Sequence, residues 1–213
     1  MIIAARTVGP FEENCYLVVD EESREAVLVD PGAEPDQLLQ WLADESVVLR
    51  GIWCTHGHLD HIGGIAGILR VHEVPVLLHP LDAPVYAYAP RAAAGYGIPF
   101  DVPPPPTGTL SEGQVLTVGR HRFTVWHVPG HSPGHVLFVG DEVILGGDLL
   151  FAGSIGRVDL PASDPAAMQR SLDRLASLPD ALQVFPGHGP STTLAVERAT
   201  NPFLRGVARL VTR

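Results

Sequence analysis

Lysine is absent from this chain of 213 residues, and cysteine, charge and long apolar runs are all scarce. All 14 basic residues are arginines, which excludes a lysine Schiff base and pyridoxal phosphate chemistry. Against them stand 24 acidic residues, which give a formal net charge of −10. That balance argues against nucleic acid or an anionic membrane as a partner, since either would require a basic stripe on the surface.

Only two cysteines are present, Cys15 and Cys54, and each lies inside an apolar run. We therefore expect buried free thiols and no disulfide framework. No apolar run approaches the roughly 20 residues of a membrane-spanning helix, and the N-terminus lacks the basic and apolar regions of an export signal. The length and composition predict a cytoplasmic protein with a single domain over residues 1–213, and they leave its oligomeric state unknown.

Apolar periodicity predicts short strands interspersed with helices along the whole chain. We expect strands over residues 2–8, 14–20, 25–30, 47–55, 75–79, 114–118, 122–127, 136–139, 142–145 and 182–185. Helices are expected over residues 35–45, 64–72, 164–178 and 193–211, with Ser163 or Asp164 capping the third and a break near Asn201-Pro202 in the last. This order suits an α/β (α+β) protein in which two sheets pack face to face with helices outside.

The segment Pro80–Gly108 is poorly periodic, and it contains three of the four tyrosines and the run Pro103–Pro106. Long irregular segments in compact domains are often functional lids or pocket walls. We give that interpretation the same weight as a plain crossover on the surface.

Four metal-capable side chains fall within six residues, directly after the predicted strand 47–55: His56, His58, Asp60 and His61. Imidazole nitrogen and carboxylate oxygen suit Zn²⁺, iron and Mn²⁺, and the lack of a thiolate argues against a closed structural zinc site. The first two histidines can project from a tight turn toward one cation, and the Asp-His pair can serve a second. Chance histidines of a surface loop would not be expected at this spacing, after a strand and before two glycines.

Three later positions share one context, in which an apolar strand ends, glycine or proline turns the chain, and a metal-capable side chain follows. They are His131, Asp148 and His188. Glycine beside such a side chain lets backbone and ligand approach a cation closely. Five histidines and two aspartates are too many for one zinc ion, but they suit two ions that share a bridging carboxylate.

With these residues in place, the chain resembles the metallo-β-lactamase-fold hydrolases, whose pattern is a His-x-His-x-Asp-His turn followed by a later His, Asp and His. It is most similar to short bacterial relatives of glyoxalase II, the hydroxyacylglutathione hydrolases. Besides the ligand motif, the matching stretches are Asn14–Leu17, Val29–Gly32, Pro129–His135 and Ser154–Pro161.

The resemblance implies a four-layer αββα sandwich with the site at one edge between the sheets. It implies two divalent metal ions, zinc first and iron or manganese as alternatives. His56, His58 and His131 would hold one ion, Asp60, His61 and His188 would hold the other, and Asp148 would bridge them. A hydroxide shared by the two metals would hydrolyse a thioester of the S-2-hydroxyacylglutathione type, and Asp60 would also orient this nucleophile.

Other polar residues have two interpretations each. Arg157 could bind a substrate carboxylate through its guanidinium fork, or it could form a structural salt bridge. His135 is interpreted first as an ordinary loop hydrogen bond, with the orientation of a metal ligand as the alternative. We expect Cys54 to pack below the site and not to bind metal. The histidines expected to be plain surface or core residues are His72, His79, His121 and His127.

Several alternative functions stay open. A persulfide dioxygenase of the same fold uses one iron held by two histidines and one aspartate, and a lactonase would use the same hydrolytic machinery. A β-lactamase is disfavoured because those enzymes lack the counterpart of Asp148, and a ribonuclease is disfavoured by the acidic composition. A non-catalytic metal-binding protein is the most remote alternative, because all seven candidate ligands are present.

The thiol carrier of the substrate is also open. Full-length glyoxalase II has an additional C-terminal helical region that supplies basic contacts to glutathione. We expect no such region here, which leaves glutathione, another small thiol or a broader range of thioesters as carriers.

Overall fold

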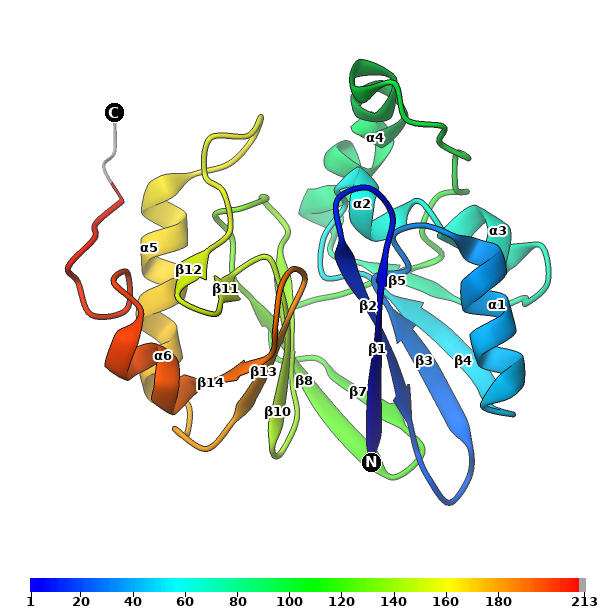
Figure 1. The fold of residues 1–213 in the computed structure, drawn as a ribbon, viewed down its shortest axis with the longest axis horizontal. Coiled ribbons are helices and arrows are strands. Elements are labelled where there is room, and N and C mark those ends of the chain that lie inside the picture. Colours follow the sequence, from blue (N-terminus) through cyan, green and yellow to red (C-terminus); the bar gives the residue numbers. More distant parts are fainter. Residues whose placement is uncertain (211–213) are drawn as a thin grey trace.

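The structure is a computed structural model that describes residues 1–210. Two six-stranded sheets pack face to face, and helices cover both outer faces (Figure 1). The first sheet is ordered β1-β2-β3-β4-β5-β6, antiparallel up to β3 and parallel from there on. Its strands are β1 (Ile2–Val8), β2 (Glu13–Val19), β3 (Glu25–Val29), β4 (Val48–Trp53), β5 (Val76–Leu78) and β6 (Gly108–Thr109).

The second sheet is ordered β14-β13-β10-β9-β8-β7, and only its β10–β13 pair is parallel. Its strands are β7 (Val115–Val118), β8 (His121–His127), β9 (Val136–Val139), β10 (Val143–Gly147), β13 (Gln183–Pro186) and β14 (Thr192–Thr193). A separate small hairpin joins β11 (Leu150–Phe151) to β12 (Ser154–Ile155). The two-residue strands were not predicted, because segments so short show no periodicity.

Helices divide between the two outer faces. Those on the side of the first sheet are α1 (Pro35–Asp44), α2 (Leu59–Ile62), α3 (Ile65–Leu69) and α4 (Ala83–Tyr96), with a 3₁₀ turn at Pro80–Asp82. Those on the side of the second sheet are α5 (Pro165–Arg174) and α6 (Leu194–Thr200), with a 3₁₀ turn at Leu175–Ser177. None of the helices within residues 1–210 is both long and apolar enough to cross a membrane. The four-layer αββα sandwich implied by the resemblance is confirmed.

Strands near the middle of each sheet are buried on both faces, so successive residues enter different cores. In β2, Leu17 packs in the core under α1 and α3, whereas Val18 packs in the core between the sheets. In β9, Leu137 packs against the α5 side and Phe138 between the sheets. This double burial explains why the strands appear in the sequence as continuous apolar runs and not as polar–apolar alternation.

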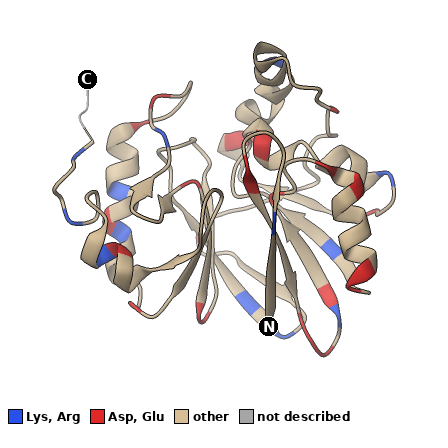
Figure 2. Cartoon of the chain, viewed as in Figure 1, with Lys and Arg blue, Asp and Glu red and all other residues tan. Residues whose placement is uncertain are grey.

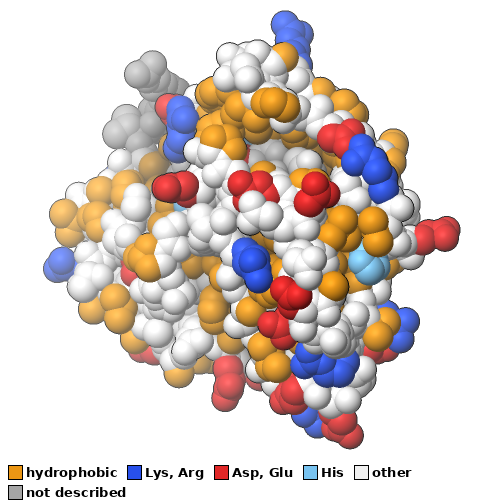
Figure 3. Space-filling view, turned by 45° about the vertical axis from the view of Figure 1, so that its right-hand side comes forward, with side chains coloured by type: hydrophobic (Ala, Val, Ile, Leu, Met, Phe, Trp, Pro, Cys, Tyr) orange, Lys and Arg blue, Asp and Glu red, His pale blue; other side chains and the backbone are white. Residues whose placement is uncertain are grey.

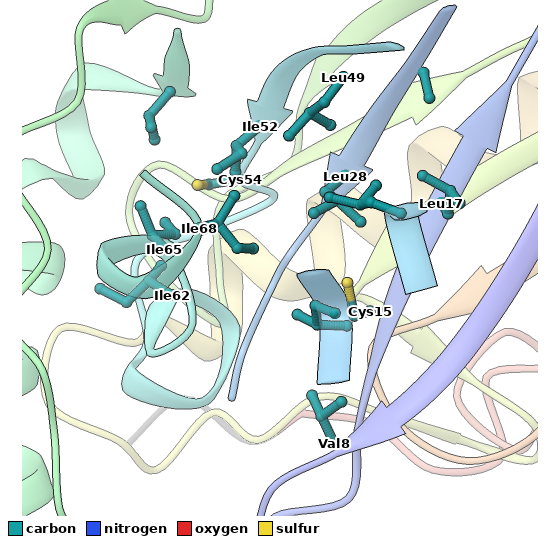
Figure 4. Packing of buried hydrophobic residues seen from close by; sticks show 14 of the residues in the cluster. Val8, Cys15, Leu17, Leu28, Leu49, Ile52, Cys54, Ile62, Ile65 and Ile68 are labelled. Carbon is teal, nitrogen blue, oxygen red and sulfur yellow. The ribbon is translucent and has the colours of Figure 1, made fainter. Parts of the chain in front are cut away.

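The outer core of the first sheet lies directly behind the metal-capable turn. Figure 4 shows Ile62, Ile65 and Ile68, from α2 and α3, near Ile52 and Cys54 at the end of β4. Both cysteines of the chain are buried and unpaired, as predicted. The apolar contacts hold α2 against the sheet and thereby fix the position of the residues that it carries.

The interpretation of Pro80–Gly108 as irregular is wrong for its first half, where α4 extends over 14 residues. Pro84 and Pro90 conceal the helix in the sequence, because an interior proline removes one backbone hydrogen bond and usually ends a helix. Gly97, with a φ of 67°, closes its C-terminus in the left-handed conformation. The helix contacts α2, so this segment lies over the metal-capable turn.

Two further helix predictions need correction. The helix expected over residues 64–72 ends at Leu69, and the separate α2 precedes it. The tail expected to be helical over residues 193–211 is helical only in α6, because the chain turns irregularly from Asn201 to residue 210 and Val211 lies outside the described residues. The start of α5 is as predicted: Asp164 accepts hydrogen bonds from the backbone N–H groups of residues 166 and 167.

Phe138 offers a test of the core between the sheets. Its side chain is fully buried, and its ring centroid lies 5.2 Å from that of Trp53. Phe138→Ala should lower the free energy of unfolding by about 3–5 kcal/mol, because it removes buried apolar surface and leaves a cavity. Denaturant unfolding measures this change. Val115→Thr, at a strand position that is 45% exposed, is the control and should change stability by less than about 0.5 kcal/mol.

Candidate metal centre

The structure brings all seven predicted ligands together at one edge of the sandwich. They come from segments that follow strands of both sheets. His56 and His58 follow β4, Asp60 and His61 lie in α2, His131 lies between β8 and β9, Asp148 follows β10, and His188 follows β13. The edge of the sandwich therefore gathers residues that are up to 132 positions apart, from residue 56 to residue 188.

Six of these residues form two groups of three. In the first group, His56, His58 and His131 offer ligand atoms that all lie within 4.8 Å of one another. The second group consists of Asp60, His61 and His188, with the same mutual spacing. Nδ1 of His58 lies 2.9 Å from Nε2 of His131 in the first group. Oδ2 of Asp60 lies 3.3 Å from Nε2 of His188 in the second. Each group has the size of a site for one ion.

The carboxylate of Asp148 lies between the two groups. Its Oδ2 is 3.4 Å from Nε2 of His131 and 3.6 Å from Nε2 of His188. Its Oδ1 is 3.5 Å from Nε2 of His61. One oxygen of this carboxylate thus neighbours members of both groups, which is the placement that a bridging ligand requires.

Hydrogen bonds at Nδ1 orient several of the histidines. His131 donates from Nδ1 to the backbone carbonyl of Arg157 over 2.8 Å, and His188 donates from Nδ1 to the carbonyl of Phe11 over 3.1 Å. Because a ring held through Nδ1–H carries its lone pair at Nε2, both Nε2 atoms are available for a cation.

Asp30, which the sequence analysis did not single out, orients one histidine in each group. Its carboxylate accepts hydrogen bonds from the N–H of Thr55 (2.7 Å), from the Thr55 hydroxyl (2.6 Å) and from Nδ1 of His61 (3.0 Å). The Thr55 oxygen in turn lies 3.0 Å from Nδ1 of His56. The sequence signals for Asp30 were its position at the end of a strand, just before Pro31-Gly32, and its place in the matching stretch Val29–Gly32.

Asp82, also missed, connects the two loops that carry the first group. Its side chain is fully buried and accepts hydrogen bonds from Gly57 N–H (2.7 Å), the Ser132 hydroxyl (2.8 Å) and Gly134 N–H (2.6 Å). Burial raises the pKa of this carboxyl above its ordinary value, although the three donors oppose that rise. The sequence showed no signal for it because the segment around it appeared irregular.

Glycine is required where the chain passes closest to these side chains. A Cβ atom on Gly187 would lie 2.3 Å from Oδ1 of Asp148. A Cβ atom on Gly130, whose φ is 146°, would lie 2.4 Å from the backbone of Met168 in α5. Only glycine therefore permits His131 and His188 to reach the centre on loops that are packed so tightly.

Burial sets the protonation of the first group. Burial lowers the pKa of His56 well below its ordinary value and lowers the pKa of His58 to about 3. The neighbouring imidazoles lower both pKa values further, by a smaller amount. Both rings are therefore neutral at pH 7, as a metal ligand must be.

In the second group, opposite charges outweigh burial. Burial alone would lower the pKa of His61, but the carboxylates of Asp148 and Asp60 raise it well above its ordinary value. Burial alone would raise the pKa of Asp60, but His61 and His188 bring it well below its ordinary value. The ionised carboxylate of Asp60 thus favours nearby positive charge.

The residues fit two divalent cations. Three buried polar atoms that face the centre have no hydrogen-bond partner among the described residues 1–210: Nε2 of His56, Nε2 of His61 and Oδ1 of Asp148. Such atoms are costly unless something occupies their lone pairs, and a cation would do so. Neutral imidazole nitrogens together with carboxylate oxygens form the donor set that zinc, iron and manganese accept.

Two other buried residues border the centre. His135 accepts at Nε2 a hydrogen bond of 2.9 Å from the backbone N–H of Asp148, so its loop hydrogen bond also positions a candidate ligand. Glu13, which the sequence analysis missed, is fully buried 3.7 Å from Nδ1 of His61. Burial raises the pKa of the Glu13 carboxyl well above its ordinary value.

A cleft of about 710 Å³ opens beside the two groups, with α4 as its opposite wall. Arg157 lines the cleft, and its guanidinium donates two hydrogen bonds to Asp159, 2.9 and 3.0 Å long. The salt bridge that was one interpretation of Arg157 is therefore present. Its backbone carbonyl has the further role of orienting His131.

The four remaining histidines belong to neither group, as predicted. All are partly buried, and they are His72, His79, His121 and His127. The rings of His79 and His127 stack at a centroid distance of 4.2 Å with an interplanar angle of 7°.

The stacked pair predicts a pH dependence of stability. Burial and the neighbouring His127 lower the pKa of His79 from its ordinary value of 6.5 to about 4. As the pH falls, the unfolded chain protonates His79 before the folded chain does. The contribution of His79 to the free energy of unfolding is therefore complete above pH 6.5 and is lost as the pH falls toward 4. Urea unfolding measures the free energy of unfolding at pH 7 and at pH 5. Between these two pH values, His79→Gln should lose less stability than the wild type, and His72→Gln is the control. An equal loss in both would contradict this prediction.

Comparisons with known proteins find one matching family and several relatives. The profile of the family described as the metallo-beta-lactamase superfamily matches residues 8–188. Hydroxyacylglutathione hydrolase GloC of Haemophilus influenzae is 35% identical, over 92% of this chain and 95% of that protein. The crystal structure of TTHA1623 in a di-iron-bound form has a TM-score of 0.88 and 47% identity, covering 94% of this chain and all of that one. BLEG-1, a B3 metallo-beta-lactamase, has a TM-score of 0.85 and 34% identity, covering 95% of this chain and 99% of its own.

Proposed function

The chain belongs to the metallo-beta-lactamase superfamily, and from that premise we propose that it is a dinuclear-metal hydrolase of thioesters of the S-2-hydroxyacylglutathione type. The observation that supports this most directly is the carboxylate of Asp148 between two groups of three candidate ligands. The similarity to GloC supports the choice of a thioester, and the di-iron form of TTHA1623 supports the pair of metals. A cytoplasmic location belongs to the same proposal, and two buried, unpaired cysteines fit it.

Each residue of the centre has a role in this proposal. One cation would be held by His56, His58 and His131, and the other by Asp60, His61 and His188. Asp148 would bind both cations. The metal would be zinc, iron or manganese. When bound, two such cations lower the pKa of a shared water toward about 7 and stabilise negative charge that develops on a carbonyl oxygen.

Asp60 is suited to a second task. Its carboxylate is partly exposed to the cleft, and neighbouring histidines keep it ionised. It would therefore accept a hydrogen bond from the attacking water and orient that water toward the thioester carbonyl. The leaving thiol has an ordinary pKa of about 8.5, so it departs as a thiolate without a strong general acid.

Metal content and turnover measured on one sample test the proposal. Freshly purified protein should contain close to two metal ions per chain and hydrolyse S-lactoylglutathione. Asp148→Ala should lose metal and lower turnover by at least about 100-fold with an unchanged circular dichroism spectrum, because the bridge between the groups is gone. Asp36→Ala, on the exposed face of α1, is the control. Full turnover in Asp148→Ala would refute the assignment of the centre.

The same sample distinguishes the alternatives. One iron per chain, no thioester hydrolysis and oxygen uptake with glutathione persulfide would indicate a persulfide dioxygenase. β-Lactam hydrolysis is a second candidate, because BLEG-1 is similar over almost its full length, and turnover of nitrocefin in place of the thioester would favour it. Turnover of a lactone alone would indicate a lactonase. Two bound metals with no turnover of any ester would indicate a non-catalytic metal-binding protein.

Asp82 provides a test of how the first group is held. The Asp82 carboxylate accepts hydrogen bonds from two N–H groups and one hydroxyl group. In Asp82→Asn, the amide NH₂ would face at least one of these donors, and because two donors cannot bond to each other, the two loops would separate. We expect metal affinity to fall by about 10- to 100-fold, as for other partners that orient metal ligands. Titration against a competing chelator measures this affinity, and Asp36→Asn is the matched control. Unchanged affinity for both metals would show that Asp82 does not set the spacing of these loops.

A further inference from the structure

The wall of the cleft opposite the metal centre is a single apolar face of α4. Val85, Tyr88, Ala92 and Tyr96 line the cleft at intervals of three and four residues, which places them on one side of the helix. Tyr88 is 46% exposed and Tyr96 is 58% exposed. Hydrophobic side chains gather around the hollow in the upper part of Figure 3, at the height of α4 in Figure 1. A large part of the cleft therefore offers aromatic and aliphatic surface to a ligand.

The two ends of this wall are held in place. The ring of Tyr96 makes an edge-to-face contact with Phe11, at a centroid distance of 5.3 Å, and the carbonyl of Phe11 accepts the Nδ1–H of His188. Nearer the start of the helix, the Tyr86 hydroxyl donates to the carbonyl of Pro104 over 2.8 Å. A wall fixed in this way is pre-organised, so little ordering is needed when a ligand binds.

Arg91 differs from the half of the chain's 14 arginines that form ion pairs within residues 1–210. Arginines are interspersed with acidic residues over both halves of the molecule (Figure 2). Seven of them form ion pairs with carboxylates, and they are Arg24, Arg50, Arg70, Arg120, Arg157, Arg174 and Arg198.

Two arginines line the cleft, and only one of them has a carboxylate partner. Arg157 is paired with Asp159, whereas Arg91 makes no ion pair within residues 1–210. The guanidinium of Arg91 lies 5.8 Å from the centre of the Tyr88 ring, a position that extends it along the aromatic wall. Arg91 thus presents an uncompensated cation, with its bidentate fork, at the edge of an apolar surface.

We propose that α4 binds the thiol-carrier half of the substrate, and that this carrier bears a carboxylate that pairs with Arg91 while its aliphatic part packs on Tyr88 and Tyr96. The inference rests on the proposed thioester hydrolysis. A 2-hydroxyacyl group is small, whereas a cleft of about 710 Å³ accommodates a much larger molecule. The carrier half must therefore occupy most of the wall, and the cation on the wall determines that this half is anionic.

A matched pair of thioesters tests the inference. S-lactoylglutathione has an anionic carrier, and S-lactoyl-N-acetylcysteamine has an uncharged one. Arg91→Gln should raise KM for the anionic thioester by about tenfold, with kcat changed by less than about twofold, because the lost interaction serves binding and not the chemical step. Both constants for the neutral thioester should stay as in the wild type. Added salt should raise KM for the anionic thioester more in the wild type than in Arg91→Gln.

The control variant is Arg122→Gln. Arg122 is exposed on β8 and does not line this cleft. It should leave all constants for both thioesters unchanged. Equal KM values in the wild type and Arg91→Gln for the anionic thioester would overturn the inference and leave the proposed function intact.

A binding measurement separates this inference from the proposed function. S-hexylglutathione is a thioether with an anionic carrier that cannot be hydrolysed, and calorimetric titration measures its affinity. Arg91→Gln should weaken this affinity by about tenfold and Arg122→Gln should not, even if the wild type hydrolyses neither thioester. No binding to the wild type, or equal binding to Arg91→Gln, would refute an anion subsite on α4.

Discussion

The hydrogen bonds accepted by the buried carboxylate of Asp30 are the interaction on which the centre depends. This one side chain holds the backbone and hydroxyl of Thr55 and the Nδ1–H of His61, and through Thr55 it also reaches His56. Both histidines consequently direct Nε2 toward the centre, where neither atom has a hydrogen-bond partner within residues 1–210. A buried carboxylate is costly unless donors surround it, so the contacts that orient the ligands also stabilise Asp30 itself.

Parallel strand pairs explain why residues so distant in sequence meet at this edge. β3 and β4 run parallel, which places Asp30 and Thr55 side by side, and the N–H of Asp30 donates to the carbonyl at the end of β4. β10 and β13 also run parallel, which brings Asp148 close to His188. A hydrogen bond of 2.7 Å from Asn14 N–H to the Gly187 carbonyl then links the two sheets at the same edge. The sandwich thus delivers ligands from both sheets to one place.

Reaction chemistry and substrate recognition are assigned to different parts of the chain. The candidate ligands stand on loops and a short helix at strand ends, where close packing around Gly130 and Gly187 allows little variation. The facing wall is one helix that carries alanine, tyrosine and Arg91, which makes no ion pair within residues 1–210. It packs on α2 and contacts Phe11, whose carbonyl accepts a hydrogen bond from His188. In the proposed function, substitutions at the cleft-facing positions of that wall would change which thioester binds.

Local signals determined much of this protein by sequence alone. Three candidate ligands, His131, Asp148 and His188, follow an apolar run and a glycine or proline turn, and the other four come directly after one predicted strand, so local patterns predicted that all of them lie at strand ends. The helix α4 could not, because its two prolines obscure the periodicity that identifies helices. The roles of Asp30 and Asp82 could not be predicted either, because their contacts are distant in sequence. Asp82 accepts a hydrogen bond from Ser132, 50 residues away, and a local sequence pattern does not indicate such a contact. Which residues hold the ligands in place, and what faces them across the cleft, was decided only by the packing of the two sheets.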